Sequence, residues 1–193
     1  ANKVIPGYYG EYARCRHLSL DEMIANIKAG KPYVIRFKSK GNHLEHVRVH
    51  DEIRGDMDLS QNDQDIVIYK SDGLPTYHFA HLVDDHYMGT TLVTRGEEWI
   101  SSLPIHIELF EAMGWKAPKY AHLPVIMVND KETHNKRKLS KRKDPEAAVS
   151  FFLEQGYPKE GVIKYLMTIA NSNFEAWLLE KSQSGLERIQ ALL

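Results

Sequence analysis

The chain has little of what would define a secreted or membrane-spanning protein. It contains one cysteine, which excludes an internal disulfide framework and fits the reducing conditions of the cytosol. No apolar run approaches the ~20 residues that a membrane span requires, and the first residues show no signal peptide. We therefore expect a cytoplasmic protein that makes no contact with a membrane.

Net charge is also nearly absent. The formal charge is −1 at pH 7, so the chain as a whole is not a binder of polyanions. Any contact with a nucleic acid must come from local clusters of positive charge. The apolar fraction of 42% over 193 residues is enough for the core of one medium domain or of two small ones.

The clearest local cluster is the octapeptide 136–143, K-R-K-L-S-K-R-K, in which six of eight residues are cationic. It follows the apolar run 122–128 and precedes Asp144-Pro145, where a helix can begin. A cationic loop in that setting suits a polyphosphate, because lysines supply positive charge and serine supplies a hydroxyl donor. The alternative is a solvated charge run or a nonspecific nucleic-acid patch. Leu139 interrupts the run with a residue of the buried type, which favours the first interpretation.

The first of three segments, residues 1–64, mixes a helix with irregular chain. Ser19 and Glu22 have the spacing of a capping box, which predicts the start of a helix. Residues 33–37 alternate as a strand should, and 43–64 is polar and is expected to be irregular.

The second segment, 65–143, alternates short apolar runs with helical patterns. Strands are expected at 65–69, 91–94 and 120–128, and helices at 76–88 and 97–113. This alternation favours a parallel sheet with helices packed on it, and hence an α/β fold. The third segment, 144–193, shows no convincing strand, and Pro145 and Pro158 stand where helices can start.

Polar groups stand where the expected strands end, which is the edge at which open α/β sheets bind ligands. Tyr77 and His81 are four residues apart on the expected helix, so they share one face. Arg95 follows the next strand and suits bidentate capture of a carboxylate, although an exposed salt bridge to a neighbouring glutamate is the alternative. The basic octapeptide follows the last strand.

Motifs over most of the chain resemble, in the same order, the second half of the catalytic domain of bacterial glutamyl-tRNA synthetases, which are class I aminoacyl-tRNA synthetases. They are Tyr77-His78-Phe79-Ala80, Val83-Asp84-Asp85-His86, Met88-Gly89, Arg95-Gly96-Glu97-Glu98-Trp99, Ser101-Ser102, Pro104, His106, Gly114-Trp115, His122-Leu123-Pro124 and Lys138-Leu139-Ser140-Lys141-Arg142. Residues 1–64 are similar to part of the connective insertion that holds the tRNA acceptor end. Residues 144–193 are similar to part of the helical stem-contact region. The resemblance implies the second half of a Rossmann-like parallel sheet domain, with a small α+β insertion and a C-terminal helical segment.

The resemblance implies a role for each matching residue. Arg95 pairs with the side-chain carboxylate of substrate glutamate, and Tyr77 forms a hydrogen bond to the same amino acid. His81 stands where the family usually has Asn, and a histidine can also donate one hydrogen bond. Glu98 and Trp99 line the adenosine pocket and contribute to ATP binding.

The catalytic loop implied by the resemblance contains Lys138, Ser140, Lys141 and Arg142, with Lys141 nearest the triphosphate of ATP. The α-carboxylate of glutamate attacks the α-phosphate, pyrophosphate leaves, and the terminal ribose hydroxyl of tRNA(Glu) attacks the resulting glutamyl-adenylate. Such catalysis consists mainly of positioning and charge neutralisation. Mg²⁺ arrives with ATP, and the protein is expected to be a monomer.

The same resemblance leads us to expect no catalysis from this chain alone. The family's first nucleotide-binding half, with its H-I-G-H-type motif, should precede the insertion, and the chain shows no such motif. The anticodon-binding domain is also missing. Zinc is not expected, because relatives that bind it in the insertion use cysteine pairs and Cys15 is single. Asp84-Asp85-His86 looks like a metal triad, but adjacent carboxylates on a helix point apart, so no metal site is predicted.

Two other classes of protein stay open. One is a related glutaminyl- or glutamyl-queuosine tRNA synthetase. Arg95 argues against a glutaminyl enzyme, because a neutral amide does not need a dedicated cation. The queuosine enzymes usually depart from the Glu-Glu-Trp found at 97–99. The other class is a non-enzymatic RNA-binding remnant that keeps the insertion and the basic loop.

Overall fold

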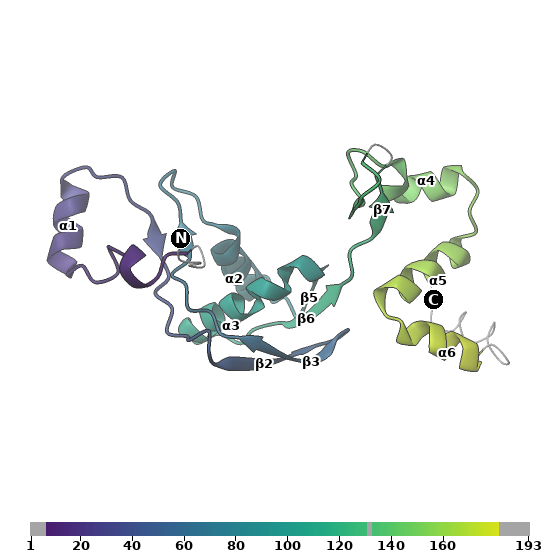
Figure 1. The fold of residues 1–193 in the computed structure, drawn as a ribbon, viewed down its shortest axis with the longest axis horizontal. Coiled ribbons are helices and arrows are strands. Elements are labelled where there is room, and N and C mark those ends of the chain that lie inside the picture. Colours follow the sequence, from purple (N-terminus) through teal and green to yellow (C-terminus); the bar gives the residue numbers. More distant parts are fainter. Residues whose placement is uncertain (1–6, 131–132, 182–193) are drawn as a thin grey trace. The chain divides into compact units, whose positions relative to one another are not determined.

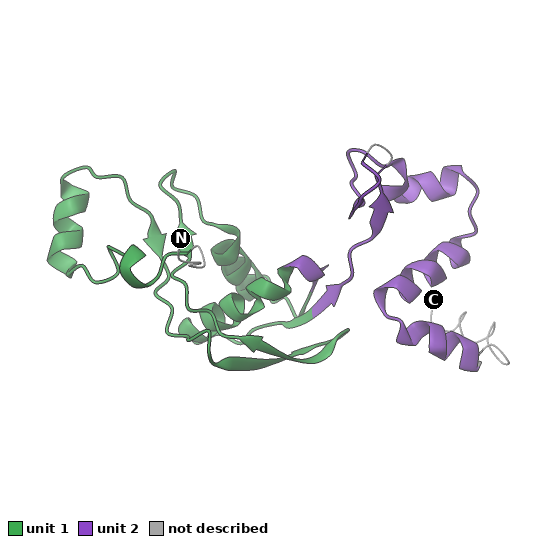
Figure 2. Cartoon of the chain, in the orientation of Figure 1, with its two compact units in different colours: residues 1–93, 99–120 green, residues 94–98, 121–193 purple. Residues whose placement is uncertain are grey.

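The computed structural model describes residues 7–130 and 133–181 (Figure 1). The chain forms two compact units, and each is described by itself (Figure 2). Unit 1 consists of Ala1–Val93 and Trp99–Tyr120, and unit 2 consists of Thr94–Glu98 and Ala121–Leu193.

Unit 1 begins with a short 3-10 helix, η1 (Gly10–Tyr12), and the α-helix α1 (Leu20–Lys28). The predicted capping box is confirmed. The Glu22 N–H donates to Ser19 Oγ (3.3 Å), and the Ser19 N–H donates to Glu22 Oε2 (2.8 Å), so two of the backbone donors at the start of the helix are satisfied.

The strands expected at 33–37 and 65–69 are present but shorter than predicted. Strand β1 (Ile35–Arg36) pairs antiparallel with β4 (Val67–Tyr69) in a small two-stranded sheet. Strand β4 is therefore paired with a strand from residues 1–64 instead of standing beside the later strands of the second segment.

The prediction of irregular chain over 43–64 is wrong. This stretch forms a hairpin of β2 (His46–Asp51) and β3 (Gly55–Ser60), paired antiparallel with His46 opposite Ser60. Its polarity hid a period of two, because half-buried apolar residues alternate with exposed polar ones along both strands. The apolar residues of that alternation are Val47, Val49, Met57 and Leu59.

A four-stranded sheet has the order β3-β2-β6-β5, in which β5 is Leu92–Gly96 and β6 is Lys119–Leu123. Strands β2 and β6 run parallel, with Asp51 opposite Tyr120. A parallel strand pair combined with helices confirms the predicted α/β class, although one strand of the pair, β2, comes from residues 1–64.

Two helices provide the core of unit 1. They are α2 (Tyr77–Tyr87) and α3 (Leu103–Ala112), and α3 is preceded by the 3-10 helix η2 (Glu97–Ser102). The predicted helix 97–113 is divided at Pro104, which lies in the first turn of α3, where its missing N–H costs nothing. Leu82, Leu109 and Phe110 are buried together.

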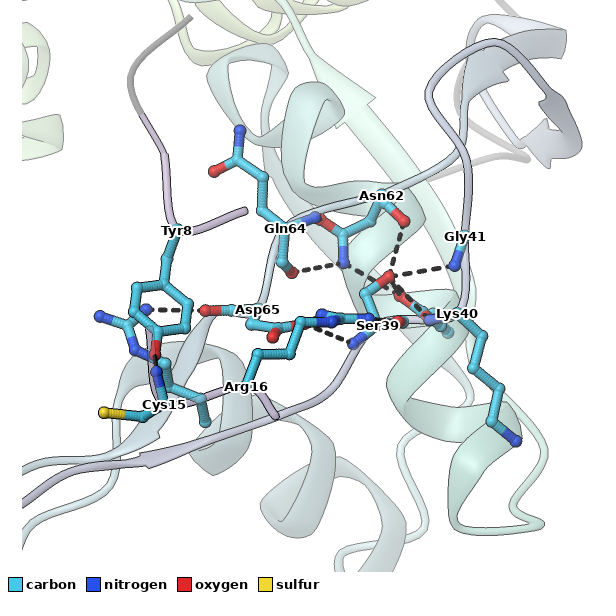
Figure 3. Close-up of polar contacts among 11 residues, drawn as sticks. Tyr8, Cys15, Arg16, Ser39, Lys40, Gly41, Asn62, Gln64 and Asp65 are labelled. Carbon is cyan, nitrogen blue, oxygen red and sulfur yellow. Dashed lines mark hydrogen bonds and ion pairs between the residues drawn. The ribbon is translucent and has the colours of Figure 1, made fainter. Parts of the chain in front are cut away.

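A polar network joins Arg16 to Ser39 and Asp65 (Figure 3). Asp65, almost fully buried, pairs with Arg16 and accepts a hydrogen bond from the Ser39 N–H (2.9 Å). Arg16 also donates to the Ser39 carbonyl oxygen (2.8 Å), and Glu108 of α3 accepts a hydrogen bond from Ser39 Oγ (2.9 Å). Segments distant in sequence are thus joined through Ser39.

Unit 2 contains a hairpin and a run of helices. The predicted strand 120–128 is two strands, β6 and β7 (Met127–Asn129), separated by a stretch that contains Pro124. Strand β7 pairs antiparallel with β8 (Lys136–Lys138), so the basic octapeptide begins as a strand and not as a loop. The elements that follow are η3 (Pro145–Ala147), α4 (Val149–Glu154), α5 (Lys159–Ala170) and α6 (Asn173–Lys181).

The third segment is helical from 145 to 181, apart from its connections, as predicted. Pro145 is the first residue of η3, and Pro158 is the N-cap of α5. Residues 182–193 of this segment lie outside the described residues. Within the described part of the chain, no helix combines the length and the apolar character that crossing a lipid bilayer requires.

Candidate active site

The predicted site residues fall into two groups. Tyr77, His81 and Trp99 belong to unit 1, whereas Arg95, Glu98 and the basic loop belong to unit 2. The geometry of each group follows from its own unit.

Tyr77 is the centre of an aromatic cluster at the start of α2. Its ring is stacked on that of His81, with centroids 5.8 Å apart and planes 8° apart, as the predicted shared helix face requires. The ring of Trp99, from η2, lies 4.4 Å from that of Tyr77. Tyr77 keeps 46% of its surface exposed, so its hydroxyl-bearing ring stands on a buried aromatic base and remains accessible to a ligand.

His81 is buried and has partners on both ring nitrogens. Nδ1 pairs with the Asp85 carboxylate one helical turn later, and Nε2 lies 3.1 Å from Oη of Tyr120. The carboxylate favours the proton on Nδ1, which makes Nε2 an acceptor for the tyrosine hydroxyl. The His81 ring, held at both nitrogens, thus supports Tyr77 by stacking.

Two further histidines, His78 and His106, pack against this cluster. Nδ1 of His78 lies 3.0 Å from Nε2 of His106, and the His106 side chain in α3 is 1% exposed. The ring of His106 also packs 4.5 Å from that of His81. His106 was named among the motifs of the resemblance but was not predicted as a site residue, because a single histidine in an apolar helix is ordinarily a core residue.

Arg95 lies near the end of β5, and its side chain is held by a residue of β6. Its Nε–H donates to Nε2 of His122 (2.9 Å), and His122 is completely buried. An imidazole that accepts through Nε2 is neutral and carries its proton on Nδ1. His122 was not predicted as a site residue, and the only signal for it was its place in the His-Leu-Pro motif.

Glu97 and Glu98, which follow Arg95 and Gly96, contact residues later in the chain. Glu98 pairs with Lys138, and this hydrogen bond lowers the pKa of the Glu98 carboxyl below its ordinary range. Glu97 Oε1 accepts a hydrogen bond from the Val125 N–H (3.4 Å). The Glu98 carboxylate lies close over Gly96, in space that a side chain at this position would occupy. A residue predicted to line the adenosine pocket is thus joined to the predicted catalytic loop.

The loop after β8 is a closed turn around Ser140. The Ser140 carbonyl oxygen accepts hydrogen bonds from the N–H groups of Lys143 (3.0 Å) and Asp144 (2.8 Å), and Ser140 Oγ accepts one from the Arg142 N–H (3.4 Å). Lys141 lies inside this turn and is exposed, as are the two cations that follow it. These hydrogen bonds therefore hold the turn in one conformation, with its three cations exposed to solvent.

A hollow of about 190 Å³ lies elsewhere in unit 1, between the insertion and α3. Its lining includes Lys40, Asn62, Ile107 and Glu108, and none of the predicted site residues. Among residues 7–130 and 133–181, no three or more His, Cys, Asp or Glu side chains gather in an arrangement that could hold a metal ion.

Comparison with known protein families gives independent support to the motifs and the fold. Residues 8–182 match the family described as tRNA synthetases class I (E and Q), catalytic domain, and the chain belongs to this family. This membership confirms the predicted class I aminoacyl-tRNA synthetase family. Together with the similarity to a solved synthetase structure, described next, it also confirms the Rossmann-like fold.

The relatives narrow the comparison to one kind of ligase. The chain is 53% identical over 193 residues to the glutamate–tRNA ligase of Clostridium beijerinckii, covering 100% of this chain and 34% of that protein. It is 58% identical over 180 residues to the glutamate–tRNA ligase of Clostridium perfringens, covering 93% and 33%. The crystal structure of glutamate–tRNA synthetase from Elizabethkingia anophelis is similar with a TM-score of 0.57 and 38% identity, covering 78% of this chain and 29% of that one. The chain therefore spans about a third of the length of these relatives.

Proposed function

We propose that this chain is part of a glutamate–tRNA ligase, which activates glutamate with ATP and transfers the glutamyl group to tRNA(Glu). The observation that carries the proposal is Arg95, which is held at a strand end by the buried His122. The family includes enzymes for glutamate and for glutamine. A guanidinium forms charge-assisted hydrogen bonds with the side-chain carboxylate of glutamate. The neutral side-chain amide of glutamine would form no such ion pair.

The amino-acid end of the site is assigned to Arg95 and Tyr77. Arg95 pairs with the side-chain carboxylate of glutamate, and the exposed Tyr77 donates a hydrogen bond to the same molecule. His81 was expected to contact glutamate. Its two engaged nitrogens favour a supporting role, in which it fixes the ring of Tyr77 by stacking.

The ATP end is assigned to Glu98, Trp99 and the loop of Lys138, Ser140, Lys141 and Arg142. The Glu98–Lys138 pair supports this assignment, because it joins the two parts that should contact the same nucleotide. Lys141 and Arg142 are exposed and suit the negative charge of the phosphates.

These residues act by position and charge. The glutamate α-carboxylate attacks the α-phosphate of ATP in line, and cations of the loop neutralise the charge that develops as pyrophosphate leaves. Mg²⁺ would arrive with ATP and would offset the negative charge of its phosphates, and no residue of this chain is assigned to hold it. The ribose hydroxyl of tRNA then takes the glutamyl group from the adenylate.

Each segment has a place in this scheme. Residues 1–64 form part of the insertion that holds the tRNA acceptor end, 65–143 the second half of the catalytic domain, and 144–193 part of the stem-contact region. Since the chain spans about a third of its relatives, we expect no catalysis from it alone. A cytoplasmic location fits its single cysteine, and the assembled ligase is expected to act as a monomer.

A chimeric ligase tests the proposal. It consists of the Clostridium beijerinckii ligase in which this chain replaces the matching third. The chimera should catalyse exchange of pyrophosphate into ATP that depends on glutamate and on tRNA(Glu), and glutamine should not replace glutamate. Exchange driven by glutamine would identify a glutaminyl enzyme instead. Binding of tRNA with no exchange, in a chimera that is folded by circular dichroism, would favour an RNA-binding remnant.

A further inference from the structure

One cation of the basic octapeptide faces carboxylates and not solvent. Nε of Arg137 donates to Asp130 Oδ2 (2.7 Å), and its two terminal nitrogens donate to the two carboxylate oxygens of Asp144 (2.6 and 2.7 Å). The side chains of Arg137, Asp130 and Asp144 are 29%, 19% and 9% exposed. We call these three residues the clasp.

The clasp fixes both ends of the predicted catalytic loop. Asp130 follows β7, Arg137 lies in the middle of β8, and Asp144 directly precedes η3. The six residues 138–143 lie between Arg137 and Asp144, so the bidentate pair closes the loop at its base. Closing a loop in the folded state removes conformations that it would otherwise sample.

Asp144 also passes this restraint on to Ser140. The same Oδ2 that pairs with Arg137 accepts a hydrogen bond from the Ser140 N–H (2.8 Å), and the Asp144 N–H donates back to the Ser140 carbonyl oxygen (2.8 Å). Ser140 is therefore held at two points by a residue that Arg137 holds at two points. Because Lys141 is the next residue, these hydrogen bonds also restrict the position of its backbone.

The charges agree with the geometry. Hydrogen bonds from Arg137, and then from the Ser140 backbone, lower the pKa of Asp144 to about 2, and the two carboxylates raise the pKa of Arg137. Arg137 thus carries a charge that is neutralised inside the loop. Its planar fork matches a carboxylate with two parallel bonds, which a lysine cannot do.

We propose that Arg137 is a positioning residue for adenylate formation: through Asp144 it holds Ser140 and Lys141 in the geometry that meets the phosphates of ATP, and it makes no phosphate contact itself. This inference rests on the proposed function. It separates the six cations by role, because Lys141 and Arg142 face the ligand while Arg137 orders the loop that carries them. Preorganisation of this kind accelerates a reaction whose catalysis is mainly positioning.

The first test measures order in the loop of the 193-residue chain. Arg137→Gln is compared with Lys136→Gln, which removes one positive charge and one trypsin site from the adjacent, exposed position of the same strand. Limited trypsin digestion is followed by mass spectrometry at the bonds after Lys141 and Arg142. We expect Arg137→Gln and Asp144→Asn to be cleaved there about tenfold faster than Lys136→Gln, because cleavage reports the open form of the loop.

The second test measures catalysis in the chimeric ligase. Arg137→Gln should lower kcat for pyrophosphate exchange about 10- to 100-fold and leave KM for glutamate within about threefold, whereas Lys136→Gln, which removes a charge outside the clasp, should lower kcat less than about threefold. Arg137→Lys keeps the charge but not the bidentate fork, so its kcat should be intermediate. A residue that only stabilised the fold would not separate kcat from KM in this way.

Each contrary outcome has a distinct meaning. Equal cleavage and equal kcat for the two glutamine variants would overturn the inference. A higher KM for ATP with unchanged cleavage would make Arg137 a phosphate ligand and overturn it as well. If the wild-type chimera shows no exchange, the proposed function and the catalytic part of the inference both fail. The cleavage rates then still decide whether the clasp orders the loop.

Discussion

The Nε–H of Arg95 donates a hydrogen bond to Nε2 of His122 over 2.9 Å, from one strand to a fully buried side chain of another. A guanidinium held through Nε has its opposite edge, with the two terminal nitrogens, in a defined direction. That edge is the one that grips a carboxylate with two parallel bonds. The tautomer of one histidine thus bears on how well the predicted glutamate site is formed.

Replacing His122 tests this dependence. His122→Leu in the chimeric ligase removes the acceptor of Arg95 Nε, and KM for glutamate should rise about 10- to 100-fold, the cost of losing a hydrogen bond to a charged group. His122→Gln supplies an acceptor oxygen and should restore most of the affinity. Initial rates of pyrophosphate exchange against glutamate concentration provide the measurement. Equal KM values for the leucine and glutamine variants would show that the hydrogen bond does not orient Arg95.

Arg95→Ala should be more severe. Without the cation, the substrate carboxylate is desolvated and unpaired, a loss of roughly 3–5 kcal/mol that should appear in the affinity for glutamate. Binding of ATP should change little, because Arg95 is assigned no contact with the nucleotide. Calorimetric titration of the chimera with each substrate separates the two affinities. Normal glutamate affinity in this variant contradicts the substrate assignment.

Lys141→Ala should have the opposite pattern. Removing a preorganised charge that acts on the transition state should lower the rate of adenylate formation about 100-fold, with only a modest change in glutamate affinity. Pre-steady-state measurement of adenylate formation gives the rate. Lys159→Ala, at the exposed start of α5, is the control for loss of one lysine. A change confined to glutamate affinity would remove Lys141 from the loop's assigned role.

The capping box of α1 can be tested in the chain alone. Ser19→Ala leaves the Glu22 N–H without its side-chain acceptor and should destabilise the helix by about 1 kcal/mol. Ser19→Asp keeps an acceptor and should cost much less. Urea unfolding followed by the circular dichroism of both variants gives the difference. If the two variants are equally stable, the cap does not stabilise α1.

The low pKa of Asp144 predicts how the clasp responds to acid. In an unfolded chain this carboxyl would titrate at about pH 3.9, and in the folded chain its pKa is about 2. Since the folded value is the lower one, the contribution of the clasp is complete above about pH 4 and is lost as the pH falls through about 2. Titration of the Asp144 carboxyl by NMR should show the low midpoint in the wild type and a higher midpoint in Arg137→Gln, in which the Ser140 backbone hydrogen bond remains. A wild-type midpoint near 4 would mean that the ion pair is weak in solution.

Local signals carried most of the correct predictions. Ser19 and Glu22 are three residues apart, so a capping box can be recognised without knowledge of the rest of the fold. The hairpin of β2 and β3 was missed because its charged positions outweighed the alternation of half-buried valines, methionine and leucine. The pairing of β4 with β1 and of β6 with β2 joins residues far apart in the sequence, and no local pattern encodes such pairing.

The candidate site shows the same division. The stacking of Tyr77 on His81 followed from their spacing of four on a helix. The contact of Arg95 with His122 spans 27 residues and depends on how two strands are placed. The sequence of 136–143 displays six positive charges alike, and only the folded loop shows that Arg137 is neutralised by Asp130 and Asp144.

The hairpin of β2 and β3 has a consequence for the behaviour of the protein in concentrated solution. Strand β3 stands at one end of the sheet order, and its exposed positions include Asp56 and Asp58. Asp56 is tied back to Arg48 and His50 of its own hairpin, both at 2.7 Å. A second copy of the chain that added its own β3 to this strand would bring like charges together. Among the described residues β3 is thus an outer strand whose aspartates oppose aggregation by strand addition.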